Sequence, residues 1–334
     1  MEITTLHWND IPSIYVAYIA ILLGFVGLIW SADRFVAGAA AMAKNMGLAP
    51  ILIGLTIVSL GTSAPEILVS INAALSNEGS IALGNAIGSN IANIGLVLAC
   101  TALVAKIPIQ RHILKDELPV LIIVTLAAGY CISDARLTRT EGWALLALLI
   151  PVMVYLIIRK TKDLSPKEKA LEQEDIPEMP TAKAVFWFVV GLVILIISSK
   201  ILVSGAKTTA EHFSVSPLII GLTVLAVGTS LPELAASIAS ALKGHHDIAL
   251  GNIIGSNIFN LLAVMSLPGI IQPLSTDPAI FHRDYATMGA LTLILVLLAG
   301  VPFLLRRKET KPSIGRLAGV GLLIIYAYYF TLLF

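Results

Sequence analysis

The chain has 334 residues, of which 57% are hydrophobic and only 13% are charged. A soluble globular protein has about 25% charged residues, so this composition excludes an ordinary soluble domain and indicates a polytopic protein of the lipid bilayer. The formal net charge of +1 gives no basis for nucleic-acid binding, and two cysteines without a CxxC or Cys/His cluster give none for zinc or redox chemistry.

Ten apolar segments are long enough to cross a membrane, for which a helix needs about 20 residues. They are residues 13–43, 49–76, 79–105, 115–133, 139–160, 182–212, 216–242, 247–271, 281–304 and 313–334. Because a lone span must satisfy its own backbone hydrogen bonds in lipid, we expect helices throughout. The predicted fold is an all-α polytopic membrane protein with ten transmembrane helices, of which the first and sixth must tilt or project beyond the bilayer.

The second segment is interrupted by Gly61-Thr62-Ser63-Ala64-Pro65-Glu66. Pro65 has no N–H to give the carbonyl of Gly61, so the helix must break or kink just before Glu66. A carboxylate at mid-span costs about 2.5–3.5 kcal/mol on insertion scales and indicates a functional site. The stretch places carbonyls, two hydroxyls and a carboxylate at one depth, and these oxygen ligands suit hard cations such as Ca²⁺ and Na⁺.

The same stretch occurs twice at a constant offset of 167 residues. Residues 54–66 recur as 221–233 with eight of thirteen positions identical, and residues 82–93 recur as 249–260 with ten of twelve identical. A shared offset over such a length indicates an internal duplication. The second copy therefore predicts a broken seventh helix and a second intramembrane carboxylate, Glu233.

Because each copy holds five spans, the second enters the membrane from the opposite side. The duplication is then an inverted repeat, an architecture typical of secondary transporters with a midplane site. We predict a first five-helix repeat at 1–160, a linker at 161–181 and a second repeat at 182–334. The linker carries the only long run of charged residues and prolines between spans, which is typical of a solvated tether.

The distribution of Lys and Arg predicts the orientation. The side with both termini carries four of these residues and the other side sixteen. Since cytoplasmic loops carry the excess of basic residues, both termini should lie outside and the linker should be cytoplasmic. The expected location is the cytoplasmic (inner) membrane.

The candidate site residues repeat across both copies. The two glutamates could instead be structural carboxylates paired with a basic residue, but their own and the following spans hold only Lys243, at one end. Two such carboxylates would repel unless a cation or proton joined them. For the polar residues of the third and eighth spans, ion binding and interhelical packing stay equally open at Ser89, Asn93, Ser256 and Asn260, whereas packing or helix capping is favoured for Asn85, Asn90, Asn252 and Asn257.

At these motifs the chain resembles the sodium/calcium exchanger family, within the cation/Ca²⁺ antiporters. The duplicated Gly-Thr-Ser-x-Pro-Glu and Gly-Ser-Asn-Ile stretches match the family's two α-repeats. The likeness is greatest to the compact bacterial and archaeal members, which lack a large cytoplasmic regulatory domain. It implies a transporter rather than an enzyme, with Ca²⁺ and Na⁺ as substrates and no cofactor, and long first and sixth helices that slide to give alternating access.

The resemblance also implies ligands. By motif position, the Ca²⁺ would lie between Glu66 and Glu233, with the backbone carbonyls of Thr62 and Thr229. The Na⁺ ligands would be Ser63, Ser230, Ser89, Ser256 and the carbonyls of Ser59 and Ala226, and Asn93 and Asn260 would complete the centre. Several relatives, including K⁺-dependent exchangers, carry Asp where this chain has Asn260, which argues against a K⁺ requirement.

Three functions remain open from the residues. The first is exchange of Na⁺ for Ca²⁺ by alternating access, and the second is H⁺/Ca²⁺ antiport by the same carboxylates. A passive cation channel could use the same oxygens but would never move Ca²⁺ uphill. An intramembrane aspartyl protease is disfavoured, because the acids are glutamates on broken helices and no Gly-x-Gly-Asp motif is present.

Overall fold

The computed structural model describes residues 11–48, 50–163, 178–214, 226–304 and 312–333. Within that part of the chain, six helices are long and apolar enough to cross a membrane, or seven if the bent pair Gly54–Thr62 and Ala64–Leu75 is one span. The seven coincide with the first, second, third, fifth, sixth, eighth and ninth predicted segments. The protein is therefore a predominantly helical, multi-pass membrane protein.

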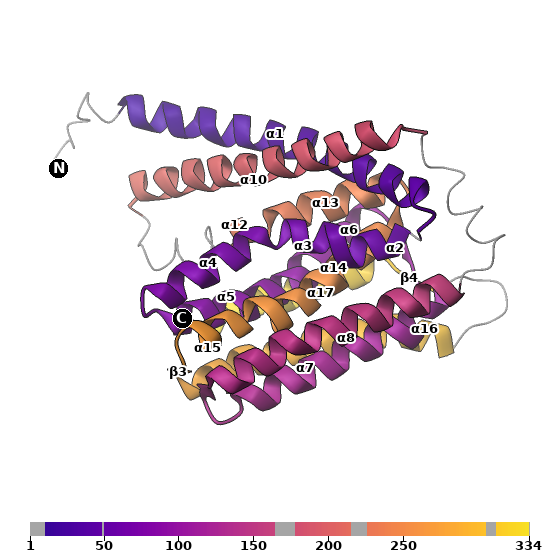
Figure 1. Cartoon of the computed structure of the whole chain (residues 1–334). Coiled ribbons are helices and arrows are strands. Elements are labelled where there is room, and N and C mark those ends of the chain that lie inside the picture. The colour runs from indigo at the N-terminus through magenta and orange to yellow at the C-terminus, as the bar shows by residue number, and fades with distance from the viewer. Residues whose placement is uncertain (1–10, 49, 164–177, 215–225, 305–311, 334) are drawn as a thin grey trace.

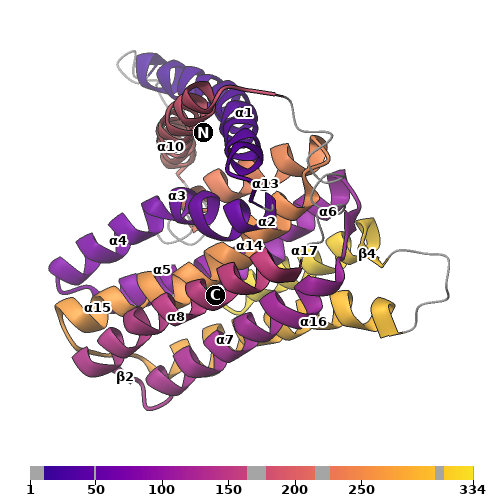
Figure 2. The same ribbon diagram turned by 45° about the vertical axis from the view of Figure 1, so that its right-hand side comes forward.

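The two longest helices form a pair beside the other helices. α1 (Ile11–Asn45) and α10 (Thr181–His212) lie side by side in both views (Figures 1 and 2). Glycines permit their close approach: a Cβ at Gly38 would meet backbone atoms of Phe188 and Ala184 at 2.5 and 2.7 Å, and Gly191 faces Phe35 as closely. Glycines at these positions let the backbones of the two helices pack closely.

The second predicted span is broken where the proline requires it. Its first half comprises α2 (Pro50–Ile53), the π-helical segment η1 (Gly54–Val58) and α3 (Ser59–Thr62), and its second half is α4 (Ala64–Leu75). The halves are bent by 50° at Ser63. The sequence prediction of a break just before Glu66 is confirmed.

The seventh span shows the same break. α12 (Ala226–Thr229) is followed by Ser230, which leaves helical geometry. Its φ of −89° and ψ of 4° resemble the −81° and 5° of Ser63. α13 (Leu231–Leu242) follows, with its proline in the first turn. Residues 215–225, which hold the beginning of the predicted span, lie outside the described residues. The described part of this span ends with α13, whose 12 residues are too few to cross a membrane alone.

The third and eighth spans form the centre of the helix bundle. The third consists of α5 (Gly79–Ala92), η2 (Asn93–Leu98) and α6 (Ala99–Val104). The eighth consists of α14 (His246–Phe259), η5 (Asn260–Val264) and α15 (Ser266–Ile271). Both change from α to π geometry at the repeated asparagine, and such π segments often occur at functional sites.

The outer helices complete the bundle. They are η3 (Ile113–Glu117) with α7 (Leu118–Ile132), α8 (Arg139–Asp163), η6 (Ile280–Tyr285) with α16 (Ala286–Leu304), and α17 (Arg316–Thr331). The first five residues of the η3–α7 helix include three charged ones, and α17 has only 16 residues. Neither is therefore among the clear membrane-crossing helices. Both still lie where the fourth and tenth spans were predicted.

Two short antiparallel ribbons join loops that are far apart in the sequence. β1 (Ile107–Pro108) pairs with β4 (Ser313–Ile314), and β2 (Arg136–Leu137) pairs with β3 (Leu274–Ser275). Each ribbon therefore links one repeat to the other. β3 and β4 lie at opposite ends of the bundle (Figure 1).

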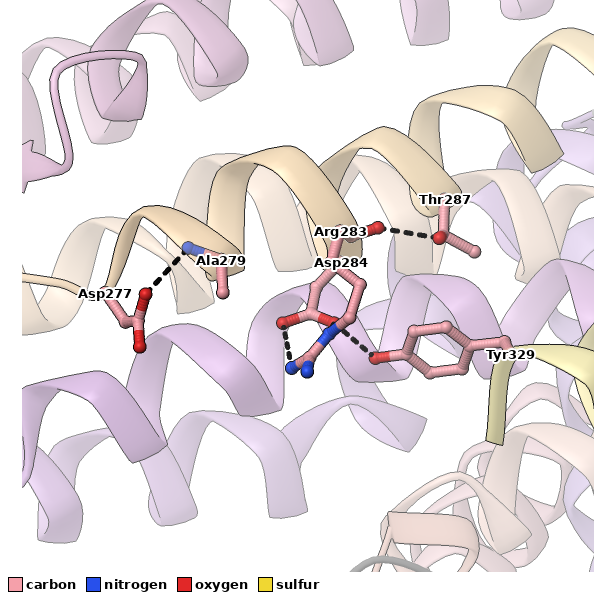
Figure 3. Close-up of polar contacts among 6 residues, drawn as sticks. All are labelled: Asp277, Ala279, Arg283, Asp284, Thr287 and Tyr329. Atoms are coloured by element: carbon pink, nitrogen blue, oxygen red, sulfur yellow. Dashed lines mark hydrogen bonds and ion pairs between the residues drawn. The ribbon is translucent and has the colours of Figure 1, made fainter. Parts of the chain in front are cut away.

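The carboxylate of Asp284, near the end of η6, is held by neighbouring side chains (Figure 3). Asp284 accepts hydrogen bonds from the Arg283 guanidinium at 2.8 Å and from the hydroxyl of Tyr329 on α17 at 3.0 Å. The residue at the equivalent position of the first repeat, Glu117, is fully buried and lies 3.2 Å from Nδ1 of His112. The duplicated acids are thus both anchored, but by different partners.

Candidate functional site

Glu66 and Glu233 begin the second halves of the two broken helices. Each lies in the first turn of its half-helix, α4 or α13, where the preceding Ser63 or Ser230 leaves helical geometry. Only 1% of each residue is exposed. A helix N-terminus carries partial positive charge and accommodates an anionic group, which favours a carboxylate at this otherwise costly position.

The two repeats exchange hydrogen bonds at these carboxylates. Ser63 Oγ of the first repeat donates to Glu233 Oε1 of the second at 3.1 Å. Ser89 Oγ on α5 donates to Glu66 Oε1 at 3.4 Å. Thr229 is a further side-chain hydrogen-bond neighbour of Glu66, and Thr62 is one of Glu233. Four residues of the predicted ligand set therefore surround the two glutamates.

A second set of polar atoms in the same region is buried without a hydrogen-bond partner among the described residues. The set comprises Oε2 of Glu66 and of Glu233, Oγ of Ser230 and of Ser256, Oδ1 of Asn93, and both side-chain polar atoms of Asn260. Leaving a buried polar group unsatisfied costs about 1–3 kcal/mol. Because native proteins satisfy most such atoms, this set indicates a hydrophilic ligand.

The predicted backbone ligands differ in their surroundings. The Ser59 carbonyl, expected to be freed by the break, accepts hydrogen bonds from Ser63 N at 3.0 Å and from Thr62 Oγ1 at 3.3 Å. In the second repeat Ser230 N donates instead to the carbonyl of Val227 at 3.1 Å, so Ala226 is not its acceptor. The break therefore redirects backbone hydrogen bonds more in one repeat than in the other.

Asn85 and Asn252 have a role that the sequence analysis missed. Asn85 Nδ2 donates to the backbone carbonyl of Glu66 at 3.1 Å, and Asn252 Nδ2 donates to that of Glu233 at 3.4 Å. Each asparagine thus ties the third or eighth span to the residue that carries the carboxylate. Their recurrence at the offset of 167, nineteen residues after each glutamate, was the signal that could have revealed this role.

The two remaining asparagines connect the central helices, as the packing interpretation predicted. Asn90 Nδ2 donates to the carbonyl of Asn257 at 3.2 Å, and Asn93 Nδ2 donates to Asn257 Oδ1 at 3.2 Å. Asn93 is therefore partly engaged in packing, and its Oδ1 is the atom left for another partner. Asn260 has neither kind of contact within the described residues.

The chemistry of the donor set fits a hard cation. The donors are carboxylate, hydroxyl, amide and carbonyl oxygens, which are the usual ligands of Ca²⁺ and Na⁺. In the described part of the chain no group of three His, Cys, Asp or Glu side chains forms a transition-metal site. Neither glutamate forms an ion pair there. Lys243 pairs instead with Asp33, with 2.6 Å between Nζ and Oδ1.

Comparison with known proteins identifies the family. The model of the sodium/calcium exchanger protein family matches residues 16–158 and 183–334. The chain belongs to the sodium/calcium exchanger family. Proteins of this family are transporters rather than enzymes, and membership supports exchange of cations for Ca²⁺ across the inner membrane.

Relatives of this exchanger-family chain match it along nearly its whole length. A candidate antiporter, CaxA of Alkalimonas amylolytica, is 48% identical over 322 residues, covering 96% of this chain and 99% of that protein. The inner membrane protein YrbG of Escherichia coli K12 is 37% identical over 308 residues, covering 91% and 92%. A solved structure of the sodium-calcium exchanger NCX_Mj superposes with a TM-score of 0.80 at 29% identity, covering 96% of this chain and all of that one. The compact prokaryotic type is therefore confirmed.

Proposed function

We propose that the protein is a secondary active antiporter that exchanges Na⁺ for Ca²⁺ at a midplane site shared by Glu66 and Glu233. The observation that carries the proposal is the pair of buried carboxylates, each with one oxygen that has no hydrogen-bond partner in the described chain. Two buried negative charges without a basic partner are stable only when a cation or protons neutralise them. One Ca²⁺ balances both charges, and Na⁺ ions can replace it.

The arrangement of hydroxyls supports competition between the two ions at one place. Ser63 and Ser89 already contact the carboxylates, whereas the hydroxyls of Ser230 and Ser256 are buried without a partner among the described residues. Ca²⁺ affinity rises with the number of charged ligands, so neutral hydroxyl and amide oxygens suit the singly charged Na⁺ better than Ca²⁺. We propose that the hydroxyls and Asn93 and Asn260 hold Na⁺ around the position that Ca²⁺ occupies between the glutamates.

The proposed architecture is ten helices in two inverted repeats, 1–160 and 182–334, joined by the linker 161–181. The two ribbons support it: β1 and β3 lie 167 residues apart, and each pairs with the loop before the last helix of a repeat. That the ribbons mark opposite ends of the bundle agrees with an inverted duplication (Figure 1). Sliding of the α1–α10 pair over the bundle would give alternating access.

The proposed orientation places both termini outside and the linker in the cytoplasm. After replacement of Cys100 and Cys131, a single cysteine at Asp134, an exposed loop residue, should react with an impermeant thiol reagent on intact cells. A cysteine at the exposed Glu178 should react only after the membrane is opened. The reverse labelling pattern would overturn the orientation.

The main alternative is H⁺/Ca²⁺ antiport by the same glutamates. Everted vesicles that receive a Na⁺ gradient or an H⁺ gradient separately distinguish the two. We expect uphill Ca²⁺ uptake with the Na⁺ gradient when a protonophore is present, and none with the H⁺ gradient in Na⁺-free buffer. The opposite result would establish proton coupling, and Ca²⁺ that only ever equilibrates would indicate a passive channel.

A further inference from the structure

Arg34 on α1 lies between two tryptophans and has no acidic partner. Its guanidinium carbon is 5.8 Å from the ring centroid of Trp30 and 5.3 Å from that of Trp187 on α10. The two indole rings meet edge to face at 6.0 Å. Within the described residues, no hydrogen bond or ion pair engages the Arg34 guanidinium. Five N–H donors on an exposed side chain therefore lack a protein acceptor.

The nearest acid in the sequence is already engaged. Asp33 accepts Nζ of Lys243 at 2.6 Å, at the end of α13. This contact ties α1 to the half-helix that carries Glu233, and it leaves the charge of Arg34 without compensation. The positive charge of Arg34 is therefore available to an anion from outside the protein.

The position of Arg34 along the helix indicates which anion is available. The large exposed apolar side chains of α1 run from Tyr15 to Trp30 and stop just before Arg34. On α10 the exposed apolar residues begin at Val185, just after the exposed Lys183. Both lipid-facing bands therefore stop at a cation.

The two boundaries lie toward the same end of the helix pair, with that of α10 nearer to the end, since Gly191 rather than Lys183 packs against Phe35. Asn45 Nδ2, at the end of α1, donates to the carbonyl of Met179 at 2.8 Å and to Thr181 Oγ1 at 3.2 Å, at the start of α10. Tryptophan and snorkelling basic residues gather where hydrocarbon meets lipid headgroups. The cluster of Trp30, Arg34, Lys183 and Trp187 thus lies at one membrane interface.

We propose that this cluster binds the phosphate of an anionic phospholipid. The planar guanidinium matches phosphate with two parallel hydrogen bonds. Lys183, one helical turn before Trp187 on the same face, adds charge, and the indole rings cover the glycerol and upper acyl region. Because the lipid is held by α1 and α10 together, it restrains the helix pair that lies beside the bundle (Figure 2).

Native mass spectrometry of protein purified with equal amounts of phosphatidylglycerol and phosphatidylcholine tests the proposal. The wild type should retain phosphatidylglycerol in preference to phosphatidylcholine. The double variant Arg34→Gln/Lys183→Gln should lose that preference by about fivefold for each cation removed. Lys200→Gln is the matched control, since Lys200 is an exposed lysine of the same helix toward its other end, and it should retain the wild-type preference.

Fluorescence provides a test that does not depend on the double variant folding. With Trp8 and Trp143 replaced by Phe, only Trp30 and Trp187 remain to report, and brominated phosphatidylglycerol should quench them more than brominated phosphatidylcholine at equal mole fraction. Equal quenching by both lipids, or a double variant that retains phosphatidylglycerol like the wild type, would overturn the proposal. Arg34 would then only snorkel into the headgroup layer. Neither measurement requires transport, so its outcome is independent of the proposed exchange.

Discussion

The two halves of the proposed cation site share a sequence motif but differ in their hydrogen bonds. In the first repeat the Ser63 hydroxyl donates to Glu233 and the Ser89 hydroxyl donates to Glu66. In the second repeat the hydroxyls of Ser230 and Ser256 are buried without partners among the described residues. The identical Gly-Thr-Ser-x-Pro-Glu stretch therefore gives a similar backbone break but does not impose one set of hydrogen bonds.

The positioning asparagines differ in the same way. Asn252 is fully buried, donates to Ser237 Oγ at 3.0 Å and accepts from Thr62 Oγ1 at 3.2 Å, besides its contact with the Glu233 carbonyl. Asn85 is half-buried and hydrogen-bonds only to the Glu66 carbonyl in the described chain. The difference teaches that equivalent serines and asparagines of the two repeats have different hydrogen-bond partners, with the serine hydroxyls satisfied in the first repeat and unsatisfied in the second among the described residues. We interpret this asymmetry as the two conformations that the proposed inverted repeats would adopt in one state of the proposed transport cycle.

The largest expected effect is loss of Ca²⁺ flux when either half loses its charge. Glu66→Gln and Glu233→Gln should each lower Na⁺-driven Ca²⁺ uptake by more than about 100-fold, because removing one partner of a buried charged set costs about 3–5 kcal/mol. Proteoliposome flux measures this. Glu78→Gln, at an exposed loop position just after α4, is the control and should transport normally. If only one glutamate variant loses flux, the repeats do not share one site.

Substitution of the positioning asparagines should reduce Ca²⁺ transport less than substitution of the glutamates, and by a different amount in each repeat. Asn252→Ala should weaken apparent Ca²⁺ affinity by about 10–100-fold, the usual range for residues that orient metal ligands. Asn85→Ala should lie at or below the low end of that range, because Asn85 is only half-buried and its side chain makes one hydrogen bond in the described chain. The concentration dependence of Ca²⁺ uptake gives both values. Equal effects would contradict the asymmetry seen in the hydrogen bonds.

The thermal stability of serine variants compares the hydrogen bonds of the two repeats directly. Ser63→Ala removes a hydrogen bond to a carboxylate, which is worth about 1.5–3 kcal/mol, and should lower the melting temperature in ion-free buffer. Ser230→Ala removes a hydroxyl without a partner among the described residues and should leave stability unchanged or slightly raised. Thermal unfolding in detergent compares the two variants. A larger loss in Ser230→Ala would show that its hydroxyl is satisfied in the ion-free protein.

The smallest expected effect is a loss of stability near Asp284, the acid at the start of the predicted ninth span. Tyr329→Phe removes the hydroxyl that donates to Asp284 but leaves the Arg283 pair (Figure 3). The free energy of unfolding should fall by about 1 kcal/mol, with normal Ca²⁺ flux. Denaturation and flux of the same preparation test this together. A large loss of flux at normal stability would place Asp284 in the transport pathway.

The sequence predicts the fold better than it predicts the contacts of the site. The break before Glu66 follows from the chemistry of Pro65 alone, and the duplication carries it to Glu233. The π segments that begin at Asn93 and Asn260 depend on how the central helices pack, which no local pattern reveals. Asn252 could be interpreted only as a packing residue, because its partners Thr62 and Ser237 belong to other helices.

The most direct test of a cation site built from both repeats is equilibrium binding of radiolabelled Ca²⁺ to the purified protein in Na⁺-free buffer. The account predicts saturable binding of one Ca²⁺ per chain, loss of that binding in both Glu66→Gln and Glu233→Gln, and displacement by Na⁺ with a steeper than hyperbolic dependence on its concentration. Wild-type Ca²⁺ affinity in either glutamate variant, or Ca²⁺ binding that Na⁺ leaves unchanged, would contradict it.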